Sequence, residues 1–311
     1  MTDSLILSEK LTGLIPEDIS SNIIQKIVKG SYCLQNSRRE PMKTVKKTIP
    51  VLVSMPGPTW VGEGKKINVV EPGIVPVTLE AKKLAFIITA SREALNDPVF
   101  NVFEDLKDSI SEAFCEAIDK AILTGSVTEG QKPFKTLYEV AEKQSVTKGS
   151  GVILDDVSDA LALVENNGHT VTNIMATNSI KNELRKLKTT TGEYLLNDTS
   201  SIFSTPTEYL SHLDPEKSLV MMGNLRDFLV TGVYQDITYD VLREATLDLG
   251  AEKVINLAQE DLVGIRVTMR IASNVLREEA FSLIKPNTLL SNETARVGTA
   301  KVGESKVGKE N

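Results

Sequence analysis

The clearest pattern of apolar positions lies between residues 97 and 124. Apolar side chains recur there at alternating steps of four and three residues, the spacing of one helix face. Asn96 or Asp97 stands at a cap position, Pro98 suits a first helical turn, and Gly125 favours termination. The pattern predicts one amphipathic helix of about seven turns. Its stripe is Val99, Phe103, Leu106, Ile110, Ala113, Ala117 and Ala121, widened by Phe114, Ile118 and Ile122.

Residues 43–91 follow a different pattern, because proline and glycine break them into short extended runs. Thr48–Val53 predicts the start of a strand. Further extended pieces lie at Ile67–Val70, Val75–Leu79 and Leu84–Thr89. We interpret most of this region as a long two-stranded excursion with Pro and Gly at its edges. Since an isolated two-stranded hairpin is marginal in water, it needs a partner surface, which another chain would supply.

The two ends of the chain carry too little apolar sequence for a core of their own. Residues 1–42 contain one short helical pattern, Ile19 to Ile27, followed by a polar run. We expect this segment to lie across another surface. In residues 287–311 Val-Gly repeats every five residues with interleaved lysines, a composition that favours a flexible tail.

Residues 130–255 mix helical and strand patterns, and residues 262–284 alternate as strands do. The class expected for the whole chain is therefore α+β, with an α/β region in the middle. Residues 189–206 have a loop-like composition. The predicted helices are Asp155–Glu165 and a segment capped by Asn178, and the predicted strands are Thr172–Ala176, Leu219–Met222 and Phe228–Val233.

Composition narrows the function classes. The net charge of -7 argues against a DNA-binding enzyme, because such proteins usually present a basic face to phosphates. It leaves open a container whose wall must not bind its DNA cargo tightly. The chain shows no signal-peptide pattern and no run of ~18 apolar residues, so we expect cytoplasmic synthesis and no membrane partner.

Candidate chemistry is sparse. The two histidines, His169 and His212, and the two cysteines, Cys33 and Cys115, form no ligand-spaced pair. Cys115 falls within the helical apolar pattern and is expected to be a buried small hydrophobe in a reducing compartment. The segment 62–66, Gly-Glu-Gly-Lys-Lys, lacks the upstream glycine and following helix of a phosphate loop. We therefore predict no catalytic, cofactor-binding or metal-binding residues and no cofactor.

A series of short motifs carries a resemblance. In order they are Thr59-Trp60-Val61-Gly62-Glu63-Gly64, Leu79-Glu80-Ala81-Lys82-Lys83-Leu84-Ala85, Ser91-Arg92-Glu93-Ala94-Leu95-Asn96-Asp97, the long helix, and Ala121-Ile122-Leu123-Thr124-Gly125. This order resembles the phage major capsid family with the Hong Kong 97-type fold. The segment from Asp261 to Phe281 is similar to that family's closing strand pair, so the resemblance covers residues 15–286.

The resemblance implies a structural protein of the virion. Such subunits form the pentamers and hexamers of an icosahedral shell, and they assemble in the host bacterial cytoplasm. The shell encloses double-stranded DNA and does not recognise its sequence. A portal protein is an implied partner. The regions implied for this chain are an N-terminal arm (1–47), an extended loop (48–82), a peripheral domain (83–129 and 256–286) with a spine helix at 97–124, an axial domain (130–255) and a flexible tail (287–311).

The resemblance also implies where subunits touch. The expected inter-subunit contacts are Trp60, Gly62, Glu63, Gly64, Lys65, Lys66, Arg92 and Glu93. For Trp60, packing within its own subunit remains the alternative. Some relatives crosslink a loop lysine to an asparagine of the closing strand beside an acid. Lys65 and Lys66 would provide the lysine, but Val263–Val267 contains no asparagine and Ala272 stands at the acid position, so we predict no autocatalytic crosslinking.

Many relatives begin with a long scaffolding segment, whereas here only 15–40 residues precede the first strand. A separate scaffolding protein is therefore expected. Two other functions stay open. One is an encapsulin, the shell protein of a bacterial nanocompartment with the same fold. The arm and the loop broken by Pro and Gly fit a phage subunit better than an encapsulin. An α/β enzyme on residues 130–255 lacks any catalytic constellation.

Overall fold

The computed structural model describes residues 30–54, 57–67, 69, 71–91, 102–125, 132–149, 151–188, 191–195, 198–248 and 254–287. The chain forms two compact units, each made of two stretches of sequence. The first unit is Met1–Lys135 with Arg226–Leu276, and the second is Thr136–Leu225 with Arg277–Asn311. Both contain helices and strands, which confirms the α+β class.

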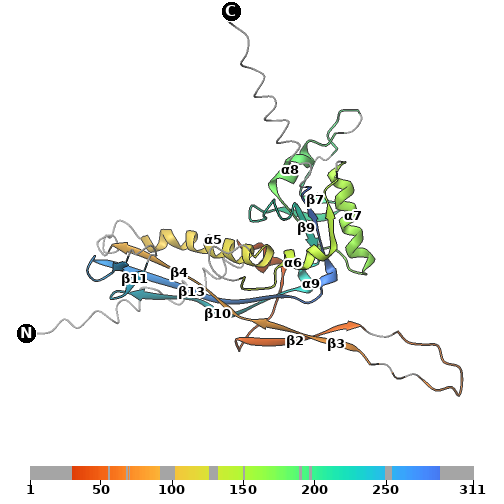
Figure 1. The fold of residues 1–311 in the computed structure, drawn as a ribbon, viewed down its shortest axis with the longest axis horizontal. Helices are drawn as coiled ribbons and strands as arrows, with labels where there is room; N and C mark the ends of the chain where they lie inside the picture. The colour runs from red at the N-terminus through yellow and green to blue at the C-terminus, as the bar shows by residue number, and fades with distance from the viewer. Residues whose placement is uncertain are drawn as a thin grey trace, which may run out of the picture. The chain divides into compact units, whose positions relative to one another are not determined.

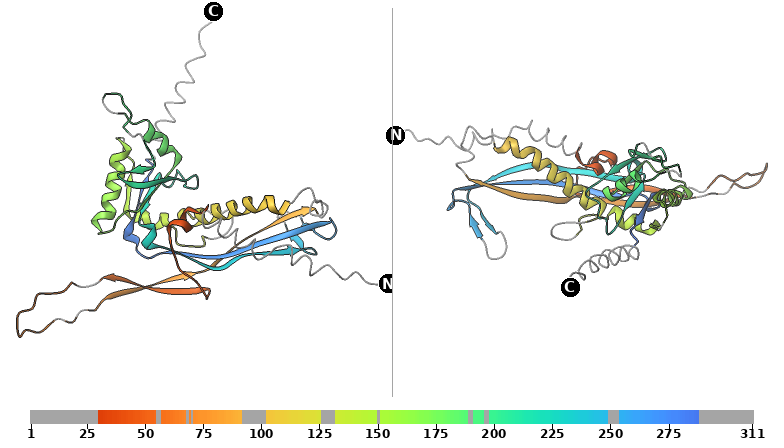
Figure 2. Two further views of the ribbon diagram at one scale, coloured as in Figure 1. Left: turned by 180° about the vertical axis from the view of Figure 1, so that it is seen from behind. Right: turned by 90° about the horizontal axis from the view of Figure 1, so that it is seen from above.

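The first unit is built around a four-stranded sheet in the order β1-β10-β13-β4. Helix α5 (Val102–Leu123) runs along one face of this sheet (Figures 1 and 2). The ring centroids of Phe86 and Phe114 lie 5.3 Å apart between sheet and helix. Helix α5 confirms the predicted helix over the residues described, and residues 97–101 lie outside them. The strands are β1 (Arg38–Arg39), β10 (Leu229–Leu242), β13 (Leu262–Val275) and β4 (Lys82–Ser91).

The predicted two-stranded excursion is an antiparallel hairpin of β2 (Lys46–Ser54) and β3 (Gly73–Glu80). A β-bulge lies between Leu52 and Ser54. Its far end extends beyond the four-stranded sheet of the same unit (Figure 1). A second, shorter ribbon pairs β11 (Thr246–Asp248) with β12 (Val254–Asn256).

The expected arm is partly built into the first unit rather than lying across another surface. Helix α3 (Tyr32–Asn36) buries Cys33 and Leu34, and β1 pairs in parallel with β10. Residues 30–42 therefore pack within the first unit, because these two apolar side chains are buried in it, and the arm over residues 1–47 stays a prediction. The predicted pattern from Ile19 to Ile27 lies outside the described residues.

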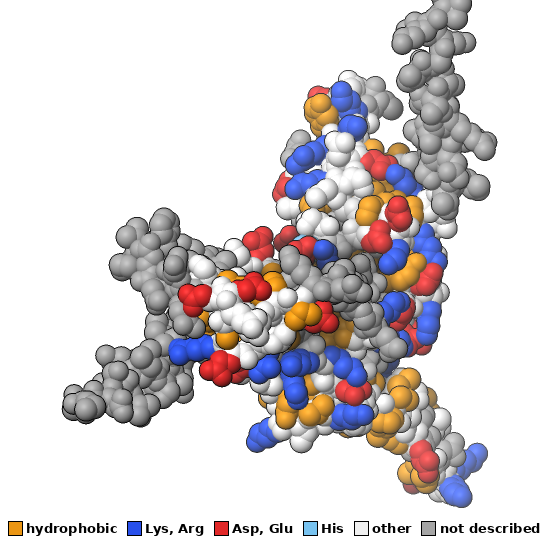
Figure 3. Space-filling view, turned by 60° about the vertical axis from the view of Figure 1, so that its left-hand side comes forward, with side chains coloured by type: hydrophobic (Ala, Val, Ile, Leu, Met, Phe, Trp, Pro, Cys, Tyr) orange, Lys and Arg blue, Asp and Glu red, His pale blue; other side chains and the backbone are white. Residues whose placement is uncertain are grey.

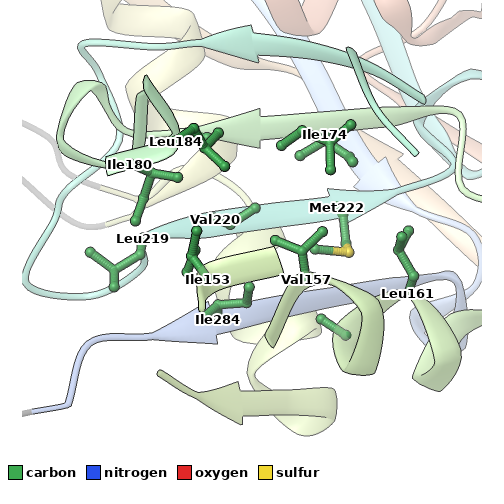
Figure 4. Close-up of a cluster of buried hydrophobic side chains, with 13 residues drawn as sticks. Ile153, Val157, Leu161, Ile174, Ile180, Leu184, Leu219, Val220, Met222 and Ile284 are labelled. Atoms are coloured by element: carbon green, nitrogen blue, oxygen red, sulfur yellow. The ribbon is translucent and has the colours of Figure 1, made fainter. Parts of the chain in front are cut away.

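The second unit centres on a mixed six-stranded sheet in the order β5-β14-β9-β6-β8-β7. Helices α7 (Ile153–Asn166) and α8 (Asn178–Arg185) pack apolar side chains against one of its faces (Figure 4). The shorter helical elements are α6 (Leu137–Ala141), η1 (Glu142–Gln144), α9 (Leu225–Phe228) and η2 (Glu278–Ala280). The strands are β5 (Ser145–Thr147), β14 (Phe281–Lys285), β9 (Val220–Gly223), β6 (Asn173–Ala176), β8 (Thr205–Tyr209) and β7 (Ser201–Ile202).

The bounds of the two units differ from the expected regions. The middle region was expected to continue to residue 255, but the chain re-enters the first unit at Arg226. The reason is that β10 pairs along its length with β13, whereas the sequence indicated only a short strand at Phe228–Val233. In the other direction, β14 belongs to the second unit because it pairs with β9 and β5.

Two local expectations also need correction. Thr177, not Asn178, is the N-cap residue of α8. The loop-like stretch 189–206 contains strand β7 and the start of β8, which form a tight hairpin. Phe203 and Ser204 at its turn both have positive φ, at 49° and 64°, a backbone that composition did not indicate because neither residue is glycine.

Candidate assembly surfaces

The base of hairpin β2–β3 is fastened to its own unit. Leu79 is fully buried in a cluster with Met42, Ala81, Val230 and Ala272, and Ile49 packs against that cluster. On β3, the Thr78 carbonyl accepts a hydrogen bond of 2.9 Å from Nδ2 of Asn274 on β13. The hairpin therefore leaves the subunit from a fixed base.

Away from this base, the apolar side chains of the hairpin are exposed. Ile74 keeps 57% of its surface, Val75 keeps 50%, and Leu52 and Val53 keep 43% and 46%. Figure 3 shows hydrophobic side chains gathered along the protruding hairpin, with charged ones at its far end. A contiguous apolar surface of this kind marks an interaction site in a soluble protein.

The loop at the tip of the hairpin contains a well-defined turn. The backbone N–H of Lys65 donates to the carbonyl of Gly62 at 3.1 Å. Gly64 has a φ of +75°, which is the third position of a type II turn and requires glycine for lack of a Cβ. This turn orders the predicted Gly-Glu-Gly sequence and leaves Glu63 and Lys66 exposed.

The structure brings six of the eight predicted contact residues together on this loop. They are Trp60, Gly62, Glu63, Gly64, Lys65 and Lys66, and all are exposed. Trp60 is fully exposed, so it does not anchor packing inside its own subunit. Arg92 and Glu93 lie outside the described residues.

A second site, which was not predicted, joins Ser31, Tyr32 and Cys33 to helix α5, and we call it the arm anchor. Asp119 on α5 is 98% buried, with 2% of its surface exposed. Its carboxylate accepts hydrogen bonds from Ser31 Oγ at 2.7 Å, from Tyr32 N at 2.9 Å and from Cys33 N at 3.0 Å. It therefore satisfies backbone donors at the start of α3, which have no partners within that helix.

Asp119 lies one turn after the buried Cys115 and outside the apolar stripe that the sequence predicts for this helix. A buried carboxylate is costly unless donors surround it, and the donors here come from residues 31–33. Helical spacing carries no signal for such a site, because an acid beside an apolar stripe ordinarily faces solvent.

Two buried thiols, those of Cys33 and Cys115, lie near this anchor, and neither forms a disulfide. Burial raises the pKa of Cys33 well above its ordinary value, and the charge of Asp119 raises it further. Burial likewise raises the pKa of Cys115 to about 11. A Cβ placed on Gly30 would come within 2.9 Å of Cys115 Sγ, so the arm backbone passes directly over this thiol. The burial predicted for Cys115 is confirmed.

Three other features can be checked in the described residues: a metal site, a membrane-spanning helix and the position of a crosslink on the closing strand. Within those residues, no three His, Cys, Asp or Glu side chains cluster as a metal site. None of the helices described there is long and apolar enough to cross a membrane. On the closing strand, Ala272 is buried in the cluster with Met42, and Asn274 is engaged with Thr78.

Comparison with known proteins agrees with this architecture. The sequence profile of the phage capsid family matches residues 12–285. The chain is 27% identical over 290 residues to the major capsid protein of Staphylococcus phage 80alpha, covering 91% of this chain and 88% of that protein.

Solved phage structures share the fold at low identity. The protein of Mycobacterium phage Adephagia superimposes with a TM-score of 0.72 at 21% identity, covering 92% of this chain and 99% of that one. For Microbacterium phage Oxtober96 the TM-score is 0.71 at 21% identity, with 83% and 91% covered. These matches are to phage proteins and not to encapsulins, and the matched family is structural rather than enzymatic. The chain belongs to the phage capsid family and is a major capsid protein that forms the shell of a virion.

Proposed function

We propose that this subunit assembles into pentamers and hexamers, with hairpin β2–β3 and its tip lying on a neighbouring subunit. The observation that carries the proposal is the exposed apolar hairpin, whose residues Ile74 and Val75 keep about half of their surface in the single chain. Burying the half of each such side chain that is still exposed contributes about 1 kcal/mol. Because each subunit touches several neighbours, modest contacts accumulate into a stable shell.

The tip residues supply a second part of the contact. Trp60 offers a large apolar surface, and Lys65 and Lys66 offer charge beside Glu63. Buried tryptophan is enriched among residues that dominate interface energies. Arg92 and Glu93 are proposed contacts on the strength of the family resemblance.

The units take different roles in the proposed shell. The first unit, with α5 as spine helix, supplies the peripheral domain, the extended loop and the arm. The second unit supplies the axial domain around the five- and six-fold axes. Closed rings of this kind use head-to-tail interfaces, so no edge remains exposed once the ring is complete.

The proposed partners are a separate scaffolding protein, a portal protein and packaged double-stranded DNA, with assembly in the host bacterial cytoplasm. The net charge of -7 suits a wall that holds DNA without binding it tightly. We also propose that mature shells are held without covalent crosslinks.

Electron microscopy of the chain, expressed alone and together with its scaffolding protein, tests these points. We expect uniform icosahedral shells in the coexpression and irregular assemblies without it. A stable monomer under both conditions would contradict the assembly proposal. Uniform shells from the chain alone would contradict the separate scaffold, and ladders of covalent multimers on denaturing gels would contradict the absence of crosslinks.

A further inference from the structure

The register of hairpin β2–β3 places two prolines directly opposite each other, Pro50 and Pro76. In an antiparallel ladder, opposite residues alternate between pairs that exchange hydrogen bonds and pairs that do not. Proline has no N–H, so this pair is of the second kind, and its backbone groups point to the outer edges of the ribbon. The carbonyl of Thr78 belongs to the same series and does point outward, since it accepts from Asn274.

The paired prolines therefore interrupt both edges at the same level. On the β2 edge no backbone donor is present at Pro50, and on the β3 edge none is present at Pro76. A strand added to either edge would cross a stretch of about 13 Å without a donor from the hairpin. Prolines at outward positions are a known protection of exposed edges against strand addition.

The same register sorts the side chains onto two faces. Pro50, Pro76 and Ile74 share one face, and Val51 and Val75 share the other. Neither strand carries a charged side chain between Thr48 and Ser54 or between Gly73 and Thr78. Near-continuous apolar runs are typical of strands that are covered on both faces, whereas a strand with one wet face alternates.

We propose that further copies of this chain cover both faces of the hairpin, and that the opposed prolines keep its edges closed to strand addition. The inference rests on the proposed docking of the hairpin and adds how it is made: by side-chain packing on two sides. A second copy is the fitting occupant because the apolar surface continues from the hairpin's own buried base at Leu79 and Ile49. It carries no charge that would select a chemically different partner, and this chain forms a shell in which copies lie side by side.

Two adjacent residues of β3 test the two faces. Ile74→Asp places a charge on the proline face and Val75→Asp places one on the valine face. Each variant is coexpressed with the scaffolding protein, and shells are quantified by sedimentation and microscopy. We expect a loss of roughly tenfold or more in shell yield from both, since a charge in a desolvated contact is poorly tolerated. The apolar replacements Ile74→Val and Val75→Ile serve as matched controls and retain assembly.

The outcomes distinguish docking of the hairpin from burial of both its faces. If only one of the aspartate variants blocks assembly, hairpin docking stands and burial on both faces is overturned. If neither does, the docking itself is wrong. Both side chains are exposed in the free subunit, so each variant should fold. Circular dichroism and denaturation of the free subunit check this.

The edges are tested by restoring the missing donors. In the double variant Pro50→Val/Pro76→Val, both edges regain an outward N–H. We expect it to form non-shell polymers that bind thioflavin T, at a level several-fold above the parent chain. Pro58→Val, which lies in the loop outside the paired strands, is the control. Normal shells without such polymers from the double variant would overturn the role given to the prolines.

Discussion

Two apolar parts of this chain differ in what covers them. In the second unit, Ile174, Val220 and Met222 are fully buried beneath α7 and α8. In hairpin β2–β3, Ile74 and Val75 have the same kind of side chain and keep about half of their surface. The sheet is covered on one face by helices of its own unit. For the hairpin, we propose that other copies of the chain supply the cover.

This contrast separates folding from assembly. Side chains buried within the subunit contribute to its free energy of unfolding, whereas exposed ones contribute when a neighbour covers them. The arm anchor at Asp119 belongs to the first class, since its hydrogen bonds are completed within one chain. Substitutions in the two classes should therefore act on different measurements.

The largest expected effect comes from a matched pair of isoleucines. Ile174→Ala should lower the free energy of unfolding of the free subunit by about 3–4 kcal/mol, because it opens a cavity in a closed core. Ile74→Ala should change it by less than about 0.5 kcal/mol, since its side chain is largely exposed. Urea denaturation followed by circular dichroism measures both. Equal losses would contradict the division between folding and assembly residues.

Removing the arm anchor should have the next largest effect. Asp119→Ala leaves buried donors of Ser31, Tyr32 and Cys33 without their acceptor and should cost about 3 kcal/mol. Asp119→Asn keeps one acceptor oxygen and should cost less. Glu116→Ala on the same helix is the control, because its ion pair with Lys120 is largely exposed and worth about 0.5 kcal/mol or less.

Thiol labelling tests whether the stability lost in Asp119→Ala is lost at the arm anchor. The raised pKa of Cys33 and of Cys115 keeps both in the unreactive thiol form near neutral pH, so the parent chain should label slowly. Asp119→Ala should speed labelling of both thiols under native conditions, since it loosens the segment that carries Cys33 and covers Cys115. Unchanged labelling together with lowered stability would argue against an arm anchor.

A matched pair of glycines should give an intermediate effect. A Cβ on Gly223 would lie 2.3 Å from Phe281 Cδ1 and 2.6 Å from the carbonyl oxygen of Ala280, so Gly223→Ala should cost about 2 kcal/mol through overpacking. A Cβ on Gly62 meets nothing within 4 Å, and Gly62→Ala should leave the free subunit unchanged. Thermal unfolding of the two variants tests this, and a tolerant Gly223 would mean that the second unit packs loosely.

The smallest expected effect is a pH dependence of the free energy of unfolding that comes from Glu40. A hydrogen bond from Lys47 lowers the pKa of Glu40, and Arg38 adds to the shift. A carboxyl whose pKa is lowered on folding stabilises the protein above its unfolded pKa of about 4.3 and loses that contribution as the pH falls through its folded value. Glu40→Gln should therefore remove less than about 1 kcal/mol at neutral pH and flatten the loss of stability in acid. A difference that grows as the pH falls would contradict this sign.

The candidate site was predictable in part. The loop from Trp60 to Lys66 was singled out by its resemblance to a family motif, and the structure adds the turn in which Gly64 takes a positive φ. The anchor at Asp119 was not predictable from the apolar stripe. Its donors come from residues 86 to 88 positions away in the chain, and spacing along a helix carries no information about them.

The sequence alone determined the helix over Val102–Leu123 and the strands of the hairpin, because local patterns set them. It also determined the order of motifs that indicated the family. Long-range pairing was decided only by the tertiary structure. The register that sets Pro50 against Pro76, the return of the chain at Arg226 along β13, and the burial of Cys33 each join distant segments. Periodicity fixes which face of an element is apolar, but the partner of that face depends on the packing of the whole chain and, for the hairpin, on the packing proposed with further copies.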